Sequence, residues 1–289
     1  MDKTNNRRLA VMIPYRDRPT ELGLLLQSLR TQTYKDFDIF IRDDASGTPI
    51  QTYYFLNMII MRMIDEGNRV TLNRNDFCLG VSGNRHALVE DVDKKRYELM
   101  ARLDDDIILE PDYLERLVKV IEMGYDMATG ITTPFQPTMK RDPKFVKIIN
   151  RIILNDNGEF VLNADDCGIR YTDSVILPAH HFRSCAVYKS KIHEKINYKP
   201  TKLSVNGYRE EELLSLKMLL AGFTIGCDTG AVNFHLMTPS GGERPTMNLA
   251  PYNHQILCEF VKENKEELNK LFPRDIDSLE LLKENNLLR

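Results

Sequence analysis

The first half of the chain alternates short apolar runs with longer segments whose apolar residues recur every three or four positions. The apolar runs at 9–14, 37–42, 69–72, 98–103 and 127–131 predict buried strands. The segments between them predict helices over 20–31, 53–66, 83–92 and 113–123. Strands that alternate with helices predict an α/β fold, with a mostly parallel central sheet and helices on both faces.

The pattern changes after residue 133. The apolar segments 152–154 and 159–162 flank a turn sequence at 155–158, which predicts a hairpin inside a smaller insertion. A helix is expected over 209–220 with Gly222 at its end, followed by a strand at 223–227. The charged residues 252–289 predict C-terminal helices, divided by Pro273.

Composition narrows the class of protein. The 289 residues are 42% hydrophobic and 28% charged, as in ordinary globular proteins, and a net charge of −3 gives no overall footprint for nucleic acid. The sequence shows no signal peptide and no transmembrane segment, since its longest apolar-rich stretch, 55–64, is too short to span a bilayer. Five scattered cysteines without CxxC spacing predict reduced thiols. We therefore expect a cytoplasmic protein, with peripheral association at a membrane left open.

Polar side chains gather where the predicted strands end. Asp43 and Asp44 close the second strand, Asn73 closes the third, and the run 104–106 of three aspartates closes the fourth. The carboxyl ends of parallel strands meet at one edge of a sheet, so these groups should lie close together. Adjacent carboxylates repel one another unless a positive partner is present, and Mn²⁺ or Mg²⁺ is the simplest one. The alternative is an acidic turn that leads into a solvated helix start at 110–112.

The order of the motifs resembles glycosyltransferase family 2 on a Rossmann-like GT-A fold. The resemblance is carried by VMIPYRDRP at 11–19, IRDDAS at 41–46, Asn73 with 80–85, LDDDI at 103–107 and REEELLSLK at 209–217. It implies a single catalytic domain over 1–250. The nucleotide-binding half would cover about 8–132 and the acceptor-side half about 133–250, with a C-terminal helical extension over 251–289.

The resemblance also implies the ligands. The donor would be a nucleotide sugar, above all a UDP-sugar, and the acceptor a hydroxyl of a glycan, a lipid-linked glycan, a protein or another molecule. Asp104 and Asp106 match the outer positions of the DXD motif and would hold Mn²⁺ or Mg²⁺, with His235 beside the metal. Asp43 would accept the uracil N3–H and Arg85 would reach the diphosphate. The expected donor-side residues are Pro14, Tyr15, Arg16, Asp43, Asp44, Asn73, Gly80, Arg85, Asp104 and Asp105.

A base is the second requirement, because the acceptor hydroxyl loses a proton as it attacks in a single, inverting displacement. The resemblance places Glu211 at that position, where the family usually carries aspartate, with Glu210 as the rival. The longer side chain shifts the carboxylate by about one C–C bond, a displacement that matters for catalytic positioning. The alternative for this cluster is a glutamate-rich helix start that interacts with the helix dipole.

Two other functions compete with a glycosyltransferase. A nucleotidyltransferase also binds nucleotides through acidic metal ligands, but it usually carries a glycine-rich basic loop after the first strand, and residues 14–19 contain no glycine. A sugar- or nucleotide-binding module without catalysis would not need the glutamate cluster. The C-terminal helices could pair two subunits into a homodimer, and their pattern fits packing within the chain equally well.

Overall fold

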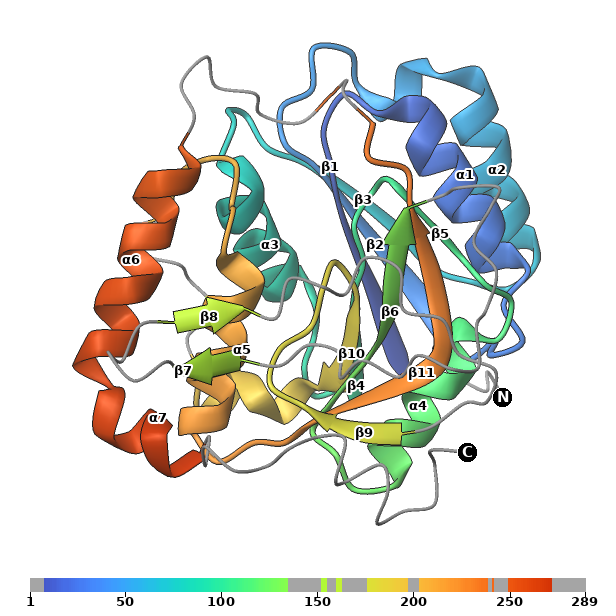
Figure 1. Cartoon of the computed structure of the whole chain (residues 1–289). Helices are drawn as coiled ribbons and strands as arrows, with labels where there is room; N and C mark the ends of the chain where they lie inside the picture. The colour runs from blue at the N-terminus through green and yellow to red at the C-terminus, as the bar shows by residue number, and fades with distance from the viewer. Residues whose placement is uncertain are drawn as a thin grey trace.

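The computed structural model describes residues 8–134, 152–154, 160–162, 176–196, 203–238, 241 and 249–271. Nine of the strands in these ranges form one sheet: β1 (Leu9–Tyr15), β2 (Phe37–Asp43), β3 (Val70–Arg74), β4 (Leu99–Arg102), β5 (Ile107–Leu109), β6 (Met127–Pro134), β9 (Ile176–Ala179), β10 (Ala186–Lys189) and β11 (Ile225–His235). Their order is β3-β2-β1-β4-β10-β6-β11-β5, and β9 pairs with β11 (Figure 1). Most strands run in one direction, and β5, β9 and β10 run against them.

Helices pack on both faces of this sheet, as the sequence predicts: α1 (Pro19–Arg30), α2 (Tyr54–Asp65) and α4 (Tyr113–Glu122) on one face, and α3 (Gly80–Asp91) and α5 (Glu210–Leu220) on the other. Helices α6 (Ala250–Glu263) and α7 (Lys265–Leu271) pack on the outer side of α5. The short 3₁₀ helices are η1 (Ile50–Thr52) and η2 (Ser190–Glu194). Each predicted strand and helix of the first half is present, with ends shifted by three residues or fewer. None of the described helices is both long and apolar enough to cross a membrane.

The alternation of side chains along β1 shows how the two faces are filled. Leu9, Val11 and Ile13 point into the core made with α1, α2 and α4. Ala10 and Met12 point to the opposite face, into the core made with α3 and α5. Burial on both sides explains why the strand reads as a continuous apolar run rather than an alternating one.

The structure adds detail in the second half. The expected hairpin is present as the antiparallel pair β7 (Ile152–Leu154) and β8 (Phe160–Leu162). The predicted strand at 223–227 is the start of the much longer β11, whose pairing register shifts between Cys227 and Val232. The polar residues Asp228, Thr229 and Gly230 lie within this irregular part and interrupt the apolar pattern. Hydrophobic periodicity therefore indicates only the first part of the strand. The C-terminal helices separate at Asn264, and Pro273 lies outside the described residues.

Strand β11 brings the two halves of the sequence to one edge of the sheet. Its first half pairs with β6 and β9, and its end pairs with β5 so that His235 lies opposite Ile107. The backbone N–H of Leu236 donates to the carbonyl of Asp106 at 2.9 Å. β5 itself was not expected, because three residues are too few to show a period. The parallel strands β1, β2 and β4 end at this same edge.

Four cysteines lie in the described residues and all are free thiols, as predicted: Cys78, Cys185, Cys227 and Cys258. Cys167 lies outside those residues.

Candidate active site

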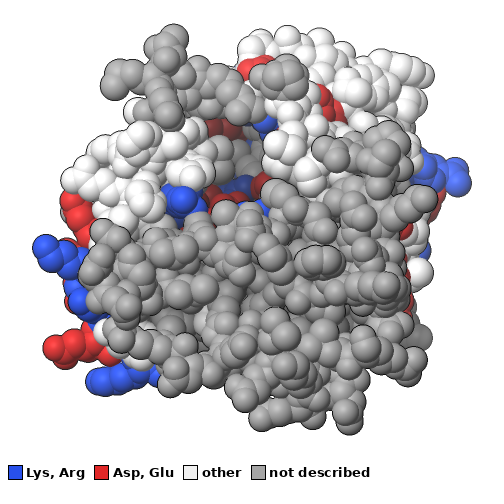
Figure 2. All heavy atoms as spheres, viewed as in Figure 1, with Lys and Arg blue, Asp and Glu red and all other residues white. Residues whose placement is uncertain are grey.

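A pocket of about 540 Å³ opens at the edge where these strands end. Figure 2 shows a hollow with acidic and basic side chains on its floor. The residues that line the pocket come from the β1 and β2 ends, the start of α3, the segment after β4, the start of α5 and the end of β11. They are Pro14, Tyr15, Arg16, Arg18, Asp44, Val81, Asn84, Arg85, Asp104, Asp105, Asp106, Asn206, Gly207, Tyr208, Glu210, Glu211, His235, Met237 and Thr238.

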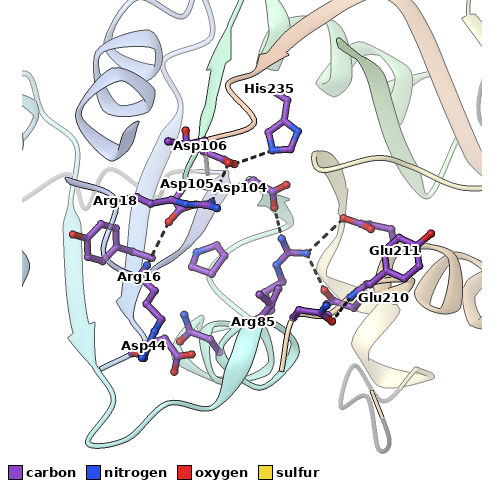
Figure 3. A pocket seen from close by; sticks show the side chains of 18 of the residues that line it. Arg16, Arg18, Asp44, Arg85, Asp104, Asp105, Asp106, Glu210, Glu211 and His235 are labelled. Carbon is purple, nitrogen blue, oxygen red and sulfur yellow. Dashed lines mark hydrogen bonds and ion pairs between the residues drawn. The ribbon is translucent and has the colours of Figure 1, made fainter. Parts of the chain in front are cut away.

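Three of these residues form a cluster that could hold a metal ion. Asp104, Asp106 and His235 each offer one ligand atom, and these atoms lie within 4.8 Å of one another. His235 Nε2 is 3.1 Å from Asp106 Oδ1 (Figure 3). Two carboxylates and an imidazole are a donor set suited to a divalent cation such as Mn²⁺. The residues therefore fit the predicted metal.

Burial perturbs the titration of the same groups. Loss of solvent raises the pKa of Asp104 to about 6 and that of Asp105 to about 7, although nearby guanidinium groups oppose the rise. Burial is the largest single influence on Asp106 and opposes its ionisation, but the hydrogen bond with His235 and the positive charges of His235 and Arg18 together lower its pKa. In the same way, burial favours a neutral His235 ring, and Asp106 nevertheless raises its pKa. The cluster holds closely spaced negative charge at low solvent exposure.

Arg18 is the cation nearest to two of the aspartates. Its Nη1 lies 2.9 Å from Asp105 Oδ1 and 3.0 Å from Asp106 Oδ2. The backbone N–H of Arg16 donates to Asp105 Oδ2 at 3.4 Å. Asp105 thus faces the β1 end, whereas its two neighbours face His235 and Arg85 (Figure 3). This division explains how three consecutive aspartates can share one turn.

An alternating series of charges runs from Asp104 to Glu211. Arg85 contacts Asp104 and also donates to Glu210 Oε2 at 3.0 Å. Arg102 lies 3.3 Å from each carboxylate oxygen of Glu210, and its Nη2 donates to Glu211 Oε1 at 3.1 Å. Figure 3 shows Arg85 between the aspartates and the two glutamates. The carboxylates at the two ends of the pocket are therefore connected by buried ion pairs.

The two glutamates have different surroundings. Glu210 is 4% exposed and is paired with both Arg85 and Arg102. The side chain of Glu211 is 27% exposed, and its hydrogen bond goes to Arg102. Both carboxylates come at the start of α5, where the helix dipole favours negative charge. Glu211 is the carboxylate that a small molecule in the pocket can reach more easily.

At the β2 end, the structure brings Asp44 to the pocket wall but leaves Asp43 behind it. Asp43 is 1% exposed, accepts from the Ser46 N–H at 2.8 Å and pairs with Arg74 at 2.6 Å. Asp44 Oδ1 accepts from Leu79 N–H at 2.8 Å. The uracil contact expected of Asp43 stays a prediction.

Two other predicted donor-side residues lie away from the pocket lining. Asn73 lies within β3, opposite Arg42, and it is Asn75, two residues later, that donates to Asp44 Oδ1 at 2.8 Å. Gly80 has φ +72°, and a Cβ there would lie 2.8 Å from the backbone of Val205. Its conformation and close contact account for glycine at this position.

Sequence reasoning missed several residues that line or support the pocket. Arg18 and Arg102 carry usable signals: the first belongs to the PYRDRP motif, and the second is a lone arginine inside an apolar strand. Arg102 is 2% exposed and its guanidinium lies 4.9 Å from the centre of the Phe182 ring. Asn206 and Tyr208 lie in an irregular loop, and no periodicity marks them.

Comparison with known proteins gives a consistent picture. Residues 10–176 match the sequence model of the family described as "Glycosyl transferase family 2". No curated protein matches the chain. Among solved structures, the chain is similar to GalNAc-T7 with UDP, GalNAc and Mn²⁺ (14% identity, TM-score 0.64, covering 97% of this chain and 55% of that one). It is also similar to residues 1–349 of S. aureus TarS in complex with UDP-GlcNAc (12% identity, TM-score 0.58, covering 88% and 65%). The chain thus spans less than two thirds of either structure, and at these identities the similarity concerns the fold.

Proposed function

Because this chain belongs to glycosyltransferase family 2, we propose that it transfers a sugar from a UDP-sugar to an acceptor hydroxyl in a metal-dependent, inverting single displacement. The observation that carries this proposal is the pairing of two features in one pocket. The Asp104–Asp106–His235 cluster lies at one end and the accessible carboxylate of Glu211 lies at the other.

The metal would be held by Asp104, Asp106 and His235. When bound, a divalent cation neutralises the charge that develops on the departing diphosphate, and so lowers the barrier to breaking the sugar–phosphate bond. Manganese or magnesium suits the donor set, and the GalNAc-T7 structure contains Mn²⁺ together with UDP.

The donor would lie along the β1 and β2 ends. Pro14, Tyr15 and Asp44 line the pocket there and would contact the nucleoside. Arg18 and Arg85 are oriented toward the aspartates, where a diphosphate would meet the metal. Guanidinium groups match phosphate oxygens in geometry and charge, so both arginines would exchange a carboxylate partner for the diphosphate when the donor binds.

Glu211 would act as the general base. Its carboxylate would take the proton of the acceptor hydroxyl while the oxygen attacks the anomeric carbon, and the bond to the diphosphate would break with its electron pair on the leaving oxygen. Both glutamates lie within ion-pair distance of Arg85 and Arg102, so the difference between them is exposure: the Glu211 side chain is 27% exposed and that of Glu210 is 5% exposed. Glu210 would therefore orient Arg85 and Arg102 rather than accept the proton.

The first experiment is a thermal-shift measurement with UDP, GDP, ADP and CDP, each with and without Mn²⁺. A ligand that binds only the native state raises the unfolding midpoint by mass action. We expect a shift with UDP that requires Mn²⁺, and no comparable shift with the other diphosphates. UTP, GTP, ATP and CTP would be measured in the same way: a shift with these triphosphates alone would instead favour a nucleotidyltransferase, and no shift with any nucleotide would contradict the proposal.

A further inference from the structure

The pocket has a wall that the donor chemistry above does not use. This acceptor wall, as we call residues Ser204–Tyr208, lies between α3 and α6, and its residues Asn206, Gly207 and Tyr208 line the pocket. It is fixed to α3 by a hydrogen bond from the N–H of Val81 to the carbonyl of Val205 at 2.9 Å. The glycine at position 80 permits this close approach.

The other side of the acceptor wall is fixed by one buried side chain. Asn253 of α6 is fully buried. Its Oδ1 accepts from the Ser204 N–H at 2.8 Å, and its Nδ2 donates to Asn206 Oδ1 at 3.0 Å. The same Asn206 oxygen accepts from Ser204 Oγ at 2.7 Å and from the Tyr208 N–H at 3.3 Å. Buried polar groups that satisfy one another in this way specify a single loop conformation.

The acceptor wall presents an aromatic ring beside the candidate base. Tyr208 comes two residues before the first residue of α5, lines the same pocket as Glu211 and is 42% exposed. The guanidinium group of Arg209 lies 4.6 Å from the centre of its ring and restricts its orientation. A large, partly exposed aromatic ring in a polar pocket is suited to ligand binding. It offers apolar contact area, and its side chain loses little conformational entropy when a ligand binds.

We propose that Tyr208 is the platform for a pyranose ring of the acceptor, and that Asn253 is the positioning residue that holds this platform. This inference rests on the proposed function. A pyranose has a face of C–H groups that packs on an aromatic ring, while its hydroxyls remain free for polar contacts. Asn206 and Glu211 line the same pocket and would supply such contacts. An open-chain polyol carries the same hydroxyls without a ring face and should bind less well.

Saturation-transfer NMR can test this with defined probes. The full chain would be mixed with UDP, Mg²⁺ and the methyl pyranosides of glucose, galactose, mannose and N-acetylglucosamine, with ribitol as the open-chain comparison. We expect at least one pyranoside to receive saturation, most strongly at its axial C–H protons, and ribitol to receive less. Tyr208→Leu should reduce the pyranoside signal at least about fivefold and Tyr208→Phe should retain it, because the ring and not the hydroxyl forms the platform.

Asn253→Ala tests the positioning role. It should weaken pyranoside binding by roughly tenfold, because it removes two hydrogen bonds that hold the loop and leaves their buried partners unsatisfied. Asn253→Asp keeps the acceptor for the Ser204 N–H but places an oxygen against Asn206 Oδ1 in a buried site, so it should weaken binding at least as much as Asn253→Ala. Gln255→Ala is the matched control, because this α6 side chain is exposed and donates to Glu259 on the same helix at 3.0 Å. When Asn253→Ala is combined with Tyr208→Leu, pyranoside binding should be no weaker than in Tyr208→Leu alone, because both changes act through one platform.

The UDP resonances in the same samples separate this inference from the proposed function. If UDP receives saturation but no pyranoside does, or if pyranoside binding survives Tyr208→Leu, the platform is wrong while the donor site stands. Stronger transfer to ribitol than to every pyranoside would also overturn it. If UDP itself receives no saturation and shows no binding by calorimetry, the proposed function fails and this inference fails with it.

Discussion

The two sides of the pocket are built in different ways. On the side proposed to bind the donor, Asp44 and the aspartates 104–106 come directly after strand ends, and the parallel register of β1, β2 and β4 brings them together. On the acceptor side, the loop that carries Tyr208 belongs to no strand and depends on Asn253, which is 49 residues away from Ser204 in the sequence. The topology of the sheet determines where the charged side chains lie. Single polar contacts determine where the surface lies that would receive the acceptor.

This difference predicts how substitutions on each side of the pocket affect binding and transfer. A change on the donor side should remove ligand binding and leave the sheet intact, because the strand ends are supported by a large core. A change on the acceptor side should alter which molecule binds, or how fast the sugar is transferred, while nucleotide binding persists. The predictions below test that division.

The largest effect is expected from Asp106→Ala. It removes a proposed metal ligand that is also the hydrogen-bond partner of His235. Even the loss of an outer-shell partner costs about 10–100-fold in metal affinity, so UDP binding in the presence of Mn²⁺ should fall by at least about 100-fold. Isothermal titration calorimetry with UDP at a fixed Mn²⁺ concentration measures this affinity. Asp105→Asn, on the same turn but facing Arg18, removes no proposed metal ligand, so it should lower UDP affinity much less and leave binding dependent on Mn²⁺. Equal affinities in Asp106→Ala and wild type would exclude this metal site.

Glu211→Gln should lower the rate of transfer by about 10²–10⁴-fold, the usual contribution of a positioned base, and leave UDP affinity unchanged. Release of UDP from a UDP-sugar in the presence of acceptor is the readout. Glu210→Gln is the informative comparison, because it disturbs the buried pairs with Arg85 and Arg102. Breaking a buried pair costs about 3–5 kcal/mol, so its unfolding midpoint should drop. Full transfer activity in Glu211→Gln would assign the base elsewhere.

A smaller effect concerns pH. In the metal-free protein the pKa values of Asp104 and Asp105 are about 6 and about 7, above the ordinary value of 3.8. Between about pH 4 and 7 the folded state therefore binds more protons than the unfolded state, and the contribution of these groups to the free energy of unfolding falls as pH rises. Metal affinity should change in the opposite direction and rise with pH, since the ligands must lose their protons before they bind the ion.

Unfolding midpoints at pH 5 to 8, with EDTA and with saturating Mn²⁺, would measure both trends. The midpoint with EDTA should decline relative to that with Mn²⁺ as pH rises, and the gap between the two should widen. Asp105→Asn removes one of the titrating groups and should flatten the metal-free trend. A gap that stays constant across this range would contradict proton-linked metal binding at the cluster.

The donor side was readable from the sequence for a physical reason. Continuous apolar runs define buried parallel strands, and polar residues at their ends must then share an edge. The strand pattern placed the aspartates 104–106 at this edge, and the family resemblance added His235 beside them. The structure brings ligand atoms of Asp104, Asp106 and His235 within 4.8 Å of one another. The orientation of Asp43 away from the pocket could not be read, because neighbouring residues on a strand end point to opposite sides and the turn decides between them.

The acceptor side was not readable for a related reason. Glu210 and Glu211 are adjacent in an apparently uniform acidic run, and both contact Arg102. Only the packing of the folded chain distinguishes them, because it leaves Glu210 4% exposed and the Glu211 side chain 27% exposed. Tyr208 and Asn253 lie in segments with no shared pattern. A hydrogen bond between a loop and a distant helix leaves no periodic trace in either one.

The late position of β11 in the sequence also implies an order in which parts of the sheet form during synthesis. His235 lies 129 residues after Asp106, and the β1–β4 part of the sheet pairs without it. A chain leaving the ribosome can therefore form the nucleotide side of the sheet early, from contacts that are close in sequence. The third proposed metal ligand arrives only when β11 has paired with β5, and the support from Asn253 arrives later still. Metal affinity would then report that the late half of the molecule has folded onto the early half.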